Sequence, residues 1–235
     1  MRFSFDNYNR QLVAAGLYAS KISARAQGTF YIRLSPPQYE TIKLMLNPFD
    51  DEFVTAFLGK KVTDNKGLTD LRVQEIVHRR DGGVLAIVEQ VREVTRQMTN
   101  ITGSLAMRSS GIRLLMDYFY DNFFAVSFSP DGTTHWKSIF YKKQMSQDDD
   151  ARYSSYFLMK STSALRFLYN DDVDRATTVS EYVLDAKGAN EHNTIYNTDG
   201  QGINFRFRDA LQVSVNEVLV PSEDRRRIKL VKIQY

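Results

Sequence analysis

Two clusters of carboxylate side chains are the residues whose types and spacing come closest to a recognisable chemistry. Asp148, Asp149 and Asp150 are contiguous, and Asp171 and Asp172 follow an apolar segment further along the chain. Carboxylates at this density suit calcium, which takes about six to eight oxygen ligands. The EF-hand pattern is absent, because the acids are contiguous and no glycine follows at the required position. Both clusters therefore have two interpretations, a calcium site that stabilises a structural module and a solvated loop.

No other arrangement of residues identifies a reaction. His78, His135 and His192 are far apart and lack zinc-ligand spacing, and the chain has no cysteine. The nucleophile motif Gly-x-Ser-x-Gly and the phosphate-binding glycine loops are also absent. The sequence thus assigns no catalytic residue and no cofactor apart from the calcium considered above, and it favours a non-enzymatic role. A carbohydrate-binding or glycoside-hydrolysing protein is the alternative, with two of its 28 acidic residues as the reactive pair and Trp136 as the sugar platform.

Aromatic side chains near the first acidic cluster are candidates for binding a partner. They are Tyr118, Phe119, Tyr120 and Tyr153, and tyrosine is common at interface anchor positions. Packing inside the fold is the other interpretation of each. The formal charge of +3 arises from 31 basic and 28 acidic residues that interleave, which does not indicate a nucleic-acid partner. We expect a protein or a cell-envelope component as partner and leave the oligomeric state open.

Short apolar segments bounded by turn residues must position these side chains. Aromatic residues make up 12% of the chain, which favours strands. The segment 123–144 illustrates the pattern, because two apolar runs flank the turn sequence Pro130-Asp131-Gly132 and predict a β-hairpin. No run of about 18 apolar residues suggests a membrane span. The prediction is an all-β protein.

Only two segments show helical spacing. The first, 51–61, places Phe53, Ala56 and Phe57 on one face and has a glycine near its end. The second, 111–118, has a weaker pattern. We expect a short helix in each.

The hairpin is repeated. When 126–140 is aligned with 183–196, Gly132 falls on Gly188, 56 residues later. Strand pairs before each hairpin recur as well, so each unit consists of four antiparallel strands, the pattern of a propeller blade. We predict a partial or minimal β-propeller of about four such blades in a single domain, 1–235, with a β-sandwich as the alternative. The predicted blades are about 1–60, 70–145, 150–200 and 204–235, and they could form the C-terminal part of a larger propeller.

The chain also resembles a known group of proteins. The segment "NFFAVSFSPDGTTHWKSIFYKKQ" and the ending "FRDALQVSVNEVLVPSEDRRRIKLVKIQY" are similar to the C-terminal region of uncharacterised β-propeller-like envelope proteins of Bacteroidota. The resemblance implies an extracytoplasmic setting, in the envelope or secreted, if a signal peptide precedes this chain, and a cytoplasmic one otherwise. It implies no catalytic residues. The expected function is a non-catalytic propeller scaffold that binds a protein or an envelope component.

Overall fold

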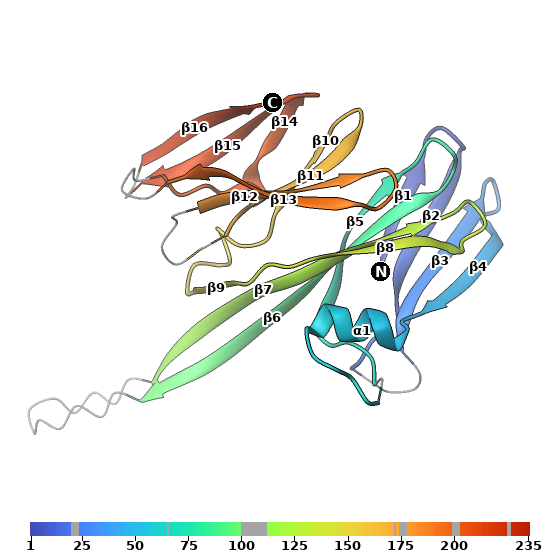
Figure 1. Ribbon diagram of the computed structural model, residues 1–235, viewed down its shortest axis with the longest axis horizontal. Coiled ribbons are helices and arrows are strands. Elements are labelled where there is room, and N and C mark those ends of the chain that lie inside the picture. The colour runs from blue at the N-terminus through green and yellow to red at the C-terminus, as the bar shows by residue number, and fades with distance from the viewer. Residues whose placement is uncertain are drawn as a thin grey trace, which may run out of the picture. The chain divides into compact units, whose positions relative to one another are not determined.

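The structure is a computed structural model, and it is all-β (Figure 1). It describes residues 1–19, 24–64, 66–99, 112–171, 173, 178–198, 203–224 and 227–235. Within these ranges, the helices are α1 (Asp51–Leu58) and the short 3-10 helix η1 (Phe207–Asp209). The strands form four antiparallel sheets, none of which closes into a barrel among the described residues. The all-β prediction is confirmed, whereas the choice between propeller and sandwich stays a prediction.

Each sheet is built from strands that follow one another along the chain. Sheet 1 contains β1 (Arg2–Asp6), β2 (Gln11–Tyr18), β3 (Gly28–Ser35) and β4 (Glu40–Pro48). Sheet 2 contains β5 (Leu71–His78), β6 (Val84–Thr99), β7 (Ile112–Phe128) and β8 (Thr134–Phe140), with β9 (Gln144–Gln147) paired to β7. Sheet 3 contains β10 (Phe157–Lys160), β11 (Ala164–Asn170), β12 (Thr178–Asp185) and β13 (Asn190–Asn197). Sheet 4 contains β14 (Leu211–Ser214), β15 (Glu217–Asp224) and β16 (Arg227–Gln234).

The two helix predictions have different outcomes. Helix α1 is present, with the Asp50 carboxylate accepting the Phe53 backbone N–H at its start and Gly59 in the left-handed region at its end. Its buried face consists of Phe53, Val54 and Phe57, so the expected Ala56 is exposed instead. The second prediction is wrong, because the described part of 111–118 lies in strand β7. Alternate residues of that strand face opposite sides, which a short periodic pattern does not distinguish from a weak helix.

The chain divides into two compact units. Unit 1 consists of 1–91, 121–142 and 184–190, and unit 2 consists of 92–120, 143–183 and 191–235. The long strands β6 and β7 therefore contribute residues to both (Figure 1). The units are described separately below.

The core of unit 1 lies between one face of sheet 1 and one face of sheet 2. Sheet 1 contributes Val13, Ala15 and Tyr31, and helix α1 adds its buried face. Sheet 2 contributes Val73, Ile76, Val84, Ala86, Val88, Phe124, Val126 and Phe128. The Phe124 ring makes edge-on contacts with the rings of Phe49, Phe53 and Phe57, at centroid distances of 5.1–5.7 Å. These contacts join the helix to sheet 2.

Unit 2 has a separate, smaller core. Sheet 3 contributes Met159, Leu168 and Val179, and sheet 4 contributes Val218 and Val220. The aromatic rings of Phe205 and Phe207, from the segment that precedes sheet 4, complete it. In each unit, therefore, the apolar face of one sheet is buried against the apolar face of another.

Three hairpin turns in unit 1 have the same backbone hydrogen bonds. In each, the first residue donates to the carbonyl four positions later and receives a bond from the N–H of a glycine three positions later. The glycines are Gly82, Gly132 and Gly188, with φ of 86°, 84° and 89°, a region that favours glycine. The hairpin predicted from segment 123–144 is confirmed, because β7 pairs with β8 around Gly132.

Candidate interaction surface

The outer face of sheet 1 is apolar from one edge of the sheet to the other. The register aligns Phe3, Ala14, Ile32 and Leu44 across the four strands, all on the face opposite the core. The apolar residues of the outer face are Phe3, Phe5, Leu12, Ala14, Gly16, Phe30, Ile32, Leu34, Leu44 and Leu46, and the uncharged Thr41 is paired with Leu34 on the same face. Its two edge strands are the most open, since Phe3, Leu44 and Leu46 are 57%, 55% and 56% exposed. Isolated exposed apolar residues are normal, but a contiguous sheet face is a binding-site signal.

Among the described residues of sheet 1, none that is charged belongs to this outer face. Arg2, Asp6, Arg33 and Lys43 are paired across the strands at the alternate positions, so they belong to the opposite face. The Phe30 ring lies over the backbone of Gly16, where an added Cβ would come within 2.4 Å of it. A larger residue at this position would require the Phe30 ring to move.

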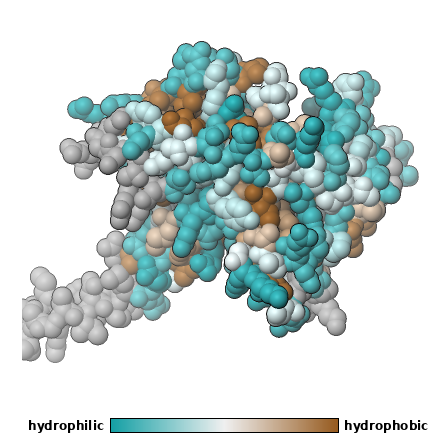
Figure 2. All heavy atoms as spheres, viewed as in Figure 1, coloured by the Kyte–Doolittle hydropathy of each residue, from teal (hydrophilic) through white to brown (hydrophobic). Residues whose placement is uncertain are grey.

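Sheet 4 also has an exposed apolar face, but this one carries charge. Leu211, Ile228 and Leu230 are 62%, 63% and 68% exposed, and they share the face opposite the core of unit 2. The same face includes Glu217 and Lys232, whose side chains form an ion pair at 3.1 Å. Figure 2 shows hydrophobic side chains at the surface over the region of β14–β16.

The first predicted acidic cluster lies in the segment that follows β9, and its carboxylates bind protein groups. Asp148 accepts the backbone N–H of Met116 at 2.8 Å. Asp149 accepts the Ser146 hydroxyl at 2.8 Å and the N–H of Ala151 at 2.9 Å. The bonds of Asp149 are local ones to Ser146 and Ala151, of the kind by which an aspartate stabilises the turn that contains it.

The second acidic cluster lies after β11. Asp171 accepts the Ser180 hydroxyl at 2.9 Å, and Asp172 lies outside the described residues. Within the described part of the chain, no group of three or more His, Asp or Glu side chains is arranged to hold a metal ion. Calcium binding at either cluster stays a prediction.

The aromatic residues predicted to bind a partner lie in unit 2. The rings or hydroxyls of three of them, Tyr118, Phe119 and Tyr153, interact with charged side chains. Tyr118 donates to Asp150 at 3.4 Å, and Tyr153 donates to Glu223 at 3.4 Å. The Arg92 guanidinium lies 4.4 Å from the centre of the Phe119 ring. Tyr120 departs from the expected exposure, because it is only 3% exposed and contributes to the interior. Sequence alternation alone could not distinguish the two faces of β7, since both carry aromatic residues.

A buried ion pair between strand β6 of sheet 2 and the segment that follows β8 was not predicted. The Lys142 ammonium lies 2.8 Å from the Glu89 carboxylate, and both side chains are completely buried. Gln74 donates to the other Glu89 oxygen at 2.7 Å. Burial lowers the pKa of Lys142, and the charges of Glu89 and Asp121 oppose that shift. The two residues are far apart in the sequence, so no local pattern could have identified the pair.

Trp136 has a packing role in unit 1. Its ring lies against Gly188, where a Cβ would come within 2.6 Å of it, and its indole N–H donates to the carbonyl of Ala186. Gly132 has the same relation to sheet 1, because a Cβ there would meet Tyr31 at 2.7 Å and Met45 at 2.9 Å. Two equivalent turns thus each place a glycine on a large side chain of a neighbouring strand.

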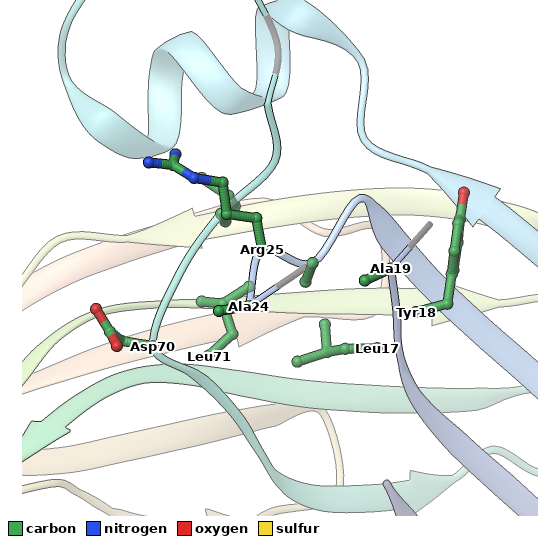
Figure 3. A pocket seen from close by; sticks show the side chains of 9 residues that line it. Leu17, Tyr18, Ala19, Ala24, Arg25, Asp70 and Leu71 are labelled. Atoms are coloured by element: carbon green, nitrogen blue, oxygen red, sulfur yellow. The ribbon is translucent and has the colours of Figure 1, made fainter. Parts of the chain in front are cut away.

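Unit 1 also contains an open pocket of about 390 Å³. Figure 3 shows small apolar side chains, among them Leu17, Ala24 and Leu71, with Arg25 and Asp70 at one end and Tyr18 at the other. The backbone of Ala26 pairs with that of Leu68 beside it. A single arginine and a single aspartate over an apolar floor do not form a recognisable catalytic arrangement.

Comparison with known proteins finds no match to this chain among protein-family models, curated proteins or solved structures. No helix in the described ranges is long and apolar enough to cross a membrane.

Proposed function

We propose that this protein is a non-catalytic scaffold of the β-propeller type that binds a protein or a cell-envelope component. The observation that carries the proposal is the outer face of sheet 1, an apolar surface without charge that crosses all four strands. A face of this kind is stabilised when a partner removes it from water.

Two features of unit 1 support the propeller arrangement. The first strand of sheet 1 lies beside the first strand of sheet 2, with Arg2 donating to the Val73 carbonyl at 3.2 Å and Ser4 within 2.6 Å of His78. Consecutive blades of a propeller meet in this way near the axis. The second feature is the pair of equivalent contacts made by Gly132 and Gly188, because the same contact at a regular interval is what a repeated blade requires.

The positions of the chemically capable side chains support a binding role over a catalytic one. The amine of Lys142 has no exposed surface, so a substrate cannot reach it without unfolding sheet 2. The Trp136 ring, which the carbohydrate hypothesis requires as a platform, lies against Gly188. The proposed setting is extracytoplasmic, as the resemblance to envelope proteins implies.

The test is recovery of a partner from the native organism with the tagged chain, compared with the variant Leu44→Lys/Leu46→Lys. Both leucines are exposed, so lysine at these positions should leave the fold intact while placing two charges on the outer face. The proposal requires a stoichiometric partner that the wild type recovers and the variant loses. Equal recovery by both chains would remove sheet 1 from the proposal, and a specific turnover of sugar substrates would replace it with the carbohydrate hypothesis.

A further inference from the structure

The outer face of sheet 1 is large enough for a specific interface. Strands lie about 4.8 Å apart and rise about 3.3 Å per residue, so four strands of up to about eight residues cover roughly 500 Å². Two such faces in contact would bury roughly 1,000 Å², near the lower limit for a specific protein–protein interface.

The charge pattern indicates what can cover this face. A two-fold interface brings a surface against its own copy, so any charge near the axis meets a like charge. The outer face of sheet 1 avoids that penalty, because Arg2, Asp6, Arg33 and Lys43 all belong to the opposite face. The exposed face of sheet 4 does not avoid it, since it carries Glu217 and Lys232.

Sheet 2 shows that a sheet of this construction is compatible with burial on both faces. In β6, the five consecutive residues from Val84 to Val88 are all at most 7% exposed, although they alternate between the two faces. Sheet 1 has its four strands in the same order as β5–β8, but its outer face is buried only at its centre, where Ala14 is 0% exposed, and is open along its edge strands.

From these observations we infer that the outer face of sheet 1 binds the same face of a second copy of this chain, forming a two-fold dimer. The inference rests on the proposed function, since it assigns an occupant to the same surface. Two sheets that pack face to face lie about 10 Å apart, and the apolar side chains of the two copies fill the space between them.

The test is the mass of the purified chain by sedimentation equilibrium over about a hundredfold range of concentration. The wild type should be a dimer at the upper end, and Leu44→Lys/Leu46→Lys should dimerise at least about a hundredfold more weakly, because each lysine would be buried without a partner. The matched control is Ile228→Lys/Leu230→Lys on sheet 4, where two residues of similar exposure receive the same charges. The control should dimerise like the wild type.

A second measurement locates the interface independently of affinity. The chain has no cysteine, so Leu44→Cys and Leu230→Cys each accept a single spin label. Labels at 44 should show strong dipolar coupling within the dimer, and labels at 230, outside the proposed interface, should show weaker coupling. A wild type that remains monomeric at every concentration overturns the inference, as does stronger coupling at 230 than at 44. Recovery of a different partner by the tagged chain is a separate result, so the scaffold proposal can survive the loss of the dimer.

Discussion

Sheets 1 and 2 have a similar strand order, but they differ in how much of each face is exposed to solvent. Both contain four strands paired in sequence order, to which sheet 2 adds β9 beside β7, and both carry apolar residues on two faces. In sheet 2, Phe123 and Phe124 point to opposite sides and both are fully buried. In sheet 1, Tyr31 is fully buried while Phe3, on the opposite face, is 57% exposed.

This difference in exposure suits the two sheets to different roles. Sheet 2 stabilises the fold, and sheet 1, by our proposal, binds a partner. Apolar area that is already buried contributes to the folded state, at about 25 cal/mol per Å². The exposed edge strands of the outer face of sheet 1, with Phe3, Leu44 and Leu46, bury less area on folding, and by our proposal that area is buried on association. Substitutions of the same kind should therefore affect unfolding in sheet 2 and association in sheet 1. The only tryptophan, Trp136, lies in unit 1 and gives a fluorescence signal for its unfolding.

The largest loss of stability should come from breaking the buried ion pair of sheet 2. Lys142→Met leaves the Glu89 carboxylate fully buried without its cationic partner. The free energy of unfolding should fall toward the upper end of about 3–5 kcal/mol. Urea unfolding followed by Trp136 fluorescence measures the change.

Two controls define this effect. Lys66→Met removes the exposed ion pair with Asp64 and should change stability by no more than about 1 kcal/mol. The double variant Lys142→Met/Glu89→Met should recover much of the loss, because it removes both buried charges. If the single Lys142 variant unfolds like the wild type, the pair does not stabilise sheet 2.

The next effect in size should come from the aromatic core. Phe124→Ala removes a fully buried ring that contacts three other rings, and it should cost about 3–4 kcal/mol in the same urea experiment. Phe3→Ala removes an identical side chain from the exposed face of sheet 1 and should cost well under about 1 kcal/mol. Equal losses would contradict the separation of stability and binding between the two sheets.

The repeated turns provide a smaller effect. Gly188→Ala places a methyl group 2.6 Å from the Trp136 ring at a φ of 89°, so it should cost about 2 kcal/mol and shift the tryptophan emission. Gly59→Ala is the control, because its φ is 65° but nothing lies within 4 Å of the added carbon. It should cost about 1 kcal/mol and leave the emission unchanged. An unchanged emission in the Gly188 variant would argue against the turn contact.

Local patterns predicted much of the fold, because they reflect local physics. Alternating apolar residues and Asp-Gly turns indicated the hairpin of β7 and β8, and the strand content followed from the aromatic and β-branched residues. The segment 111–118 was misassigned because eight residues are too few to distinguish the alternation of a strand from a weak helical period.

The candidate surface could be predicted less well, since it depends on contacts between distant residues. Phe3 and Leu44 become neighbours on one face only through the register of four strands, and Lys142 meets Glu89 only in the folded sheet. Tyr120 illustrates the converse, because an aromatic residue expected at an interface is buried. Exposure is a property of the whole fold, so residue type alone does not reveal it.

The smallest expected effect concerns the start of helix α1, which connects sheet 1 to sheet 2. The Asp50 carboxylate accepts the Lys137 ammonium at 2.6 Å and the Phe53 N–H at 2.7 Å, and these bonds hold its pKa below the ordinary value. Since the folded-state pKa is the lower one, the stabilisation is complete above the unfolded-state pKa of about 4 and is lost as the pH falls through the folded-state value. Asp50→Ala should therefore cost about 1 kcal/mol at neutral pH, and its difference from the wild type should shrink in acid. The measurement is urea unfolding of both chains between about pH 7 and pH 3. If the difference in the free energy of unfolding stays constant over this range, the charge of the Asp50 carboxylate does not contribute to stability. The residue would then stabilise the helix only through interactions that do not depend on its charge.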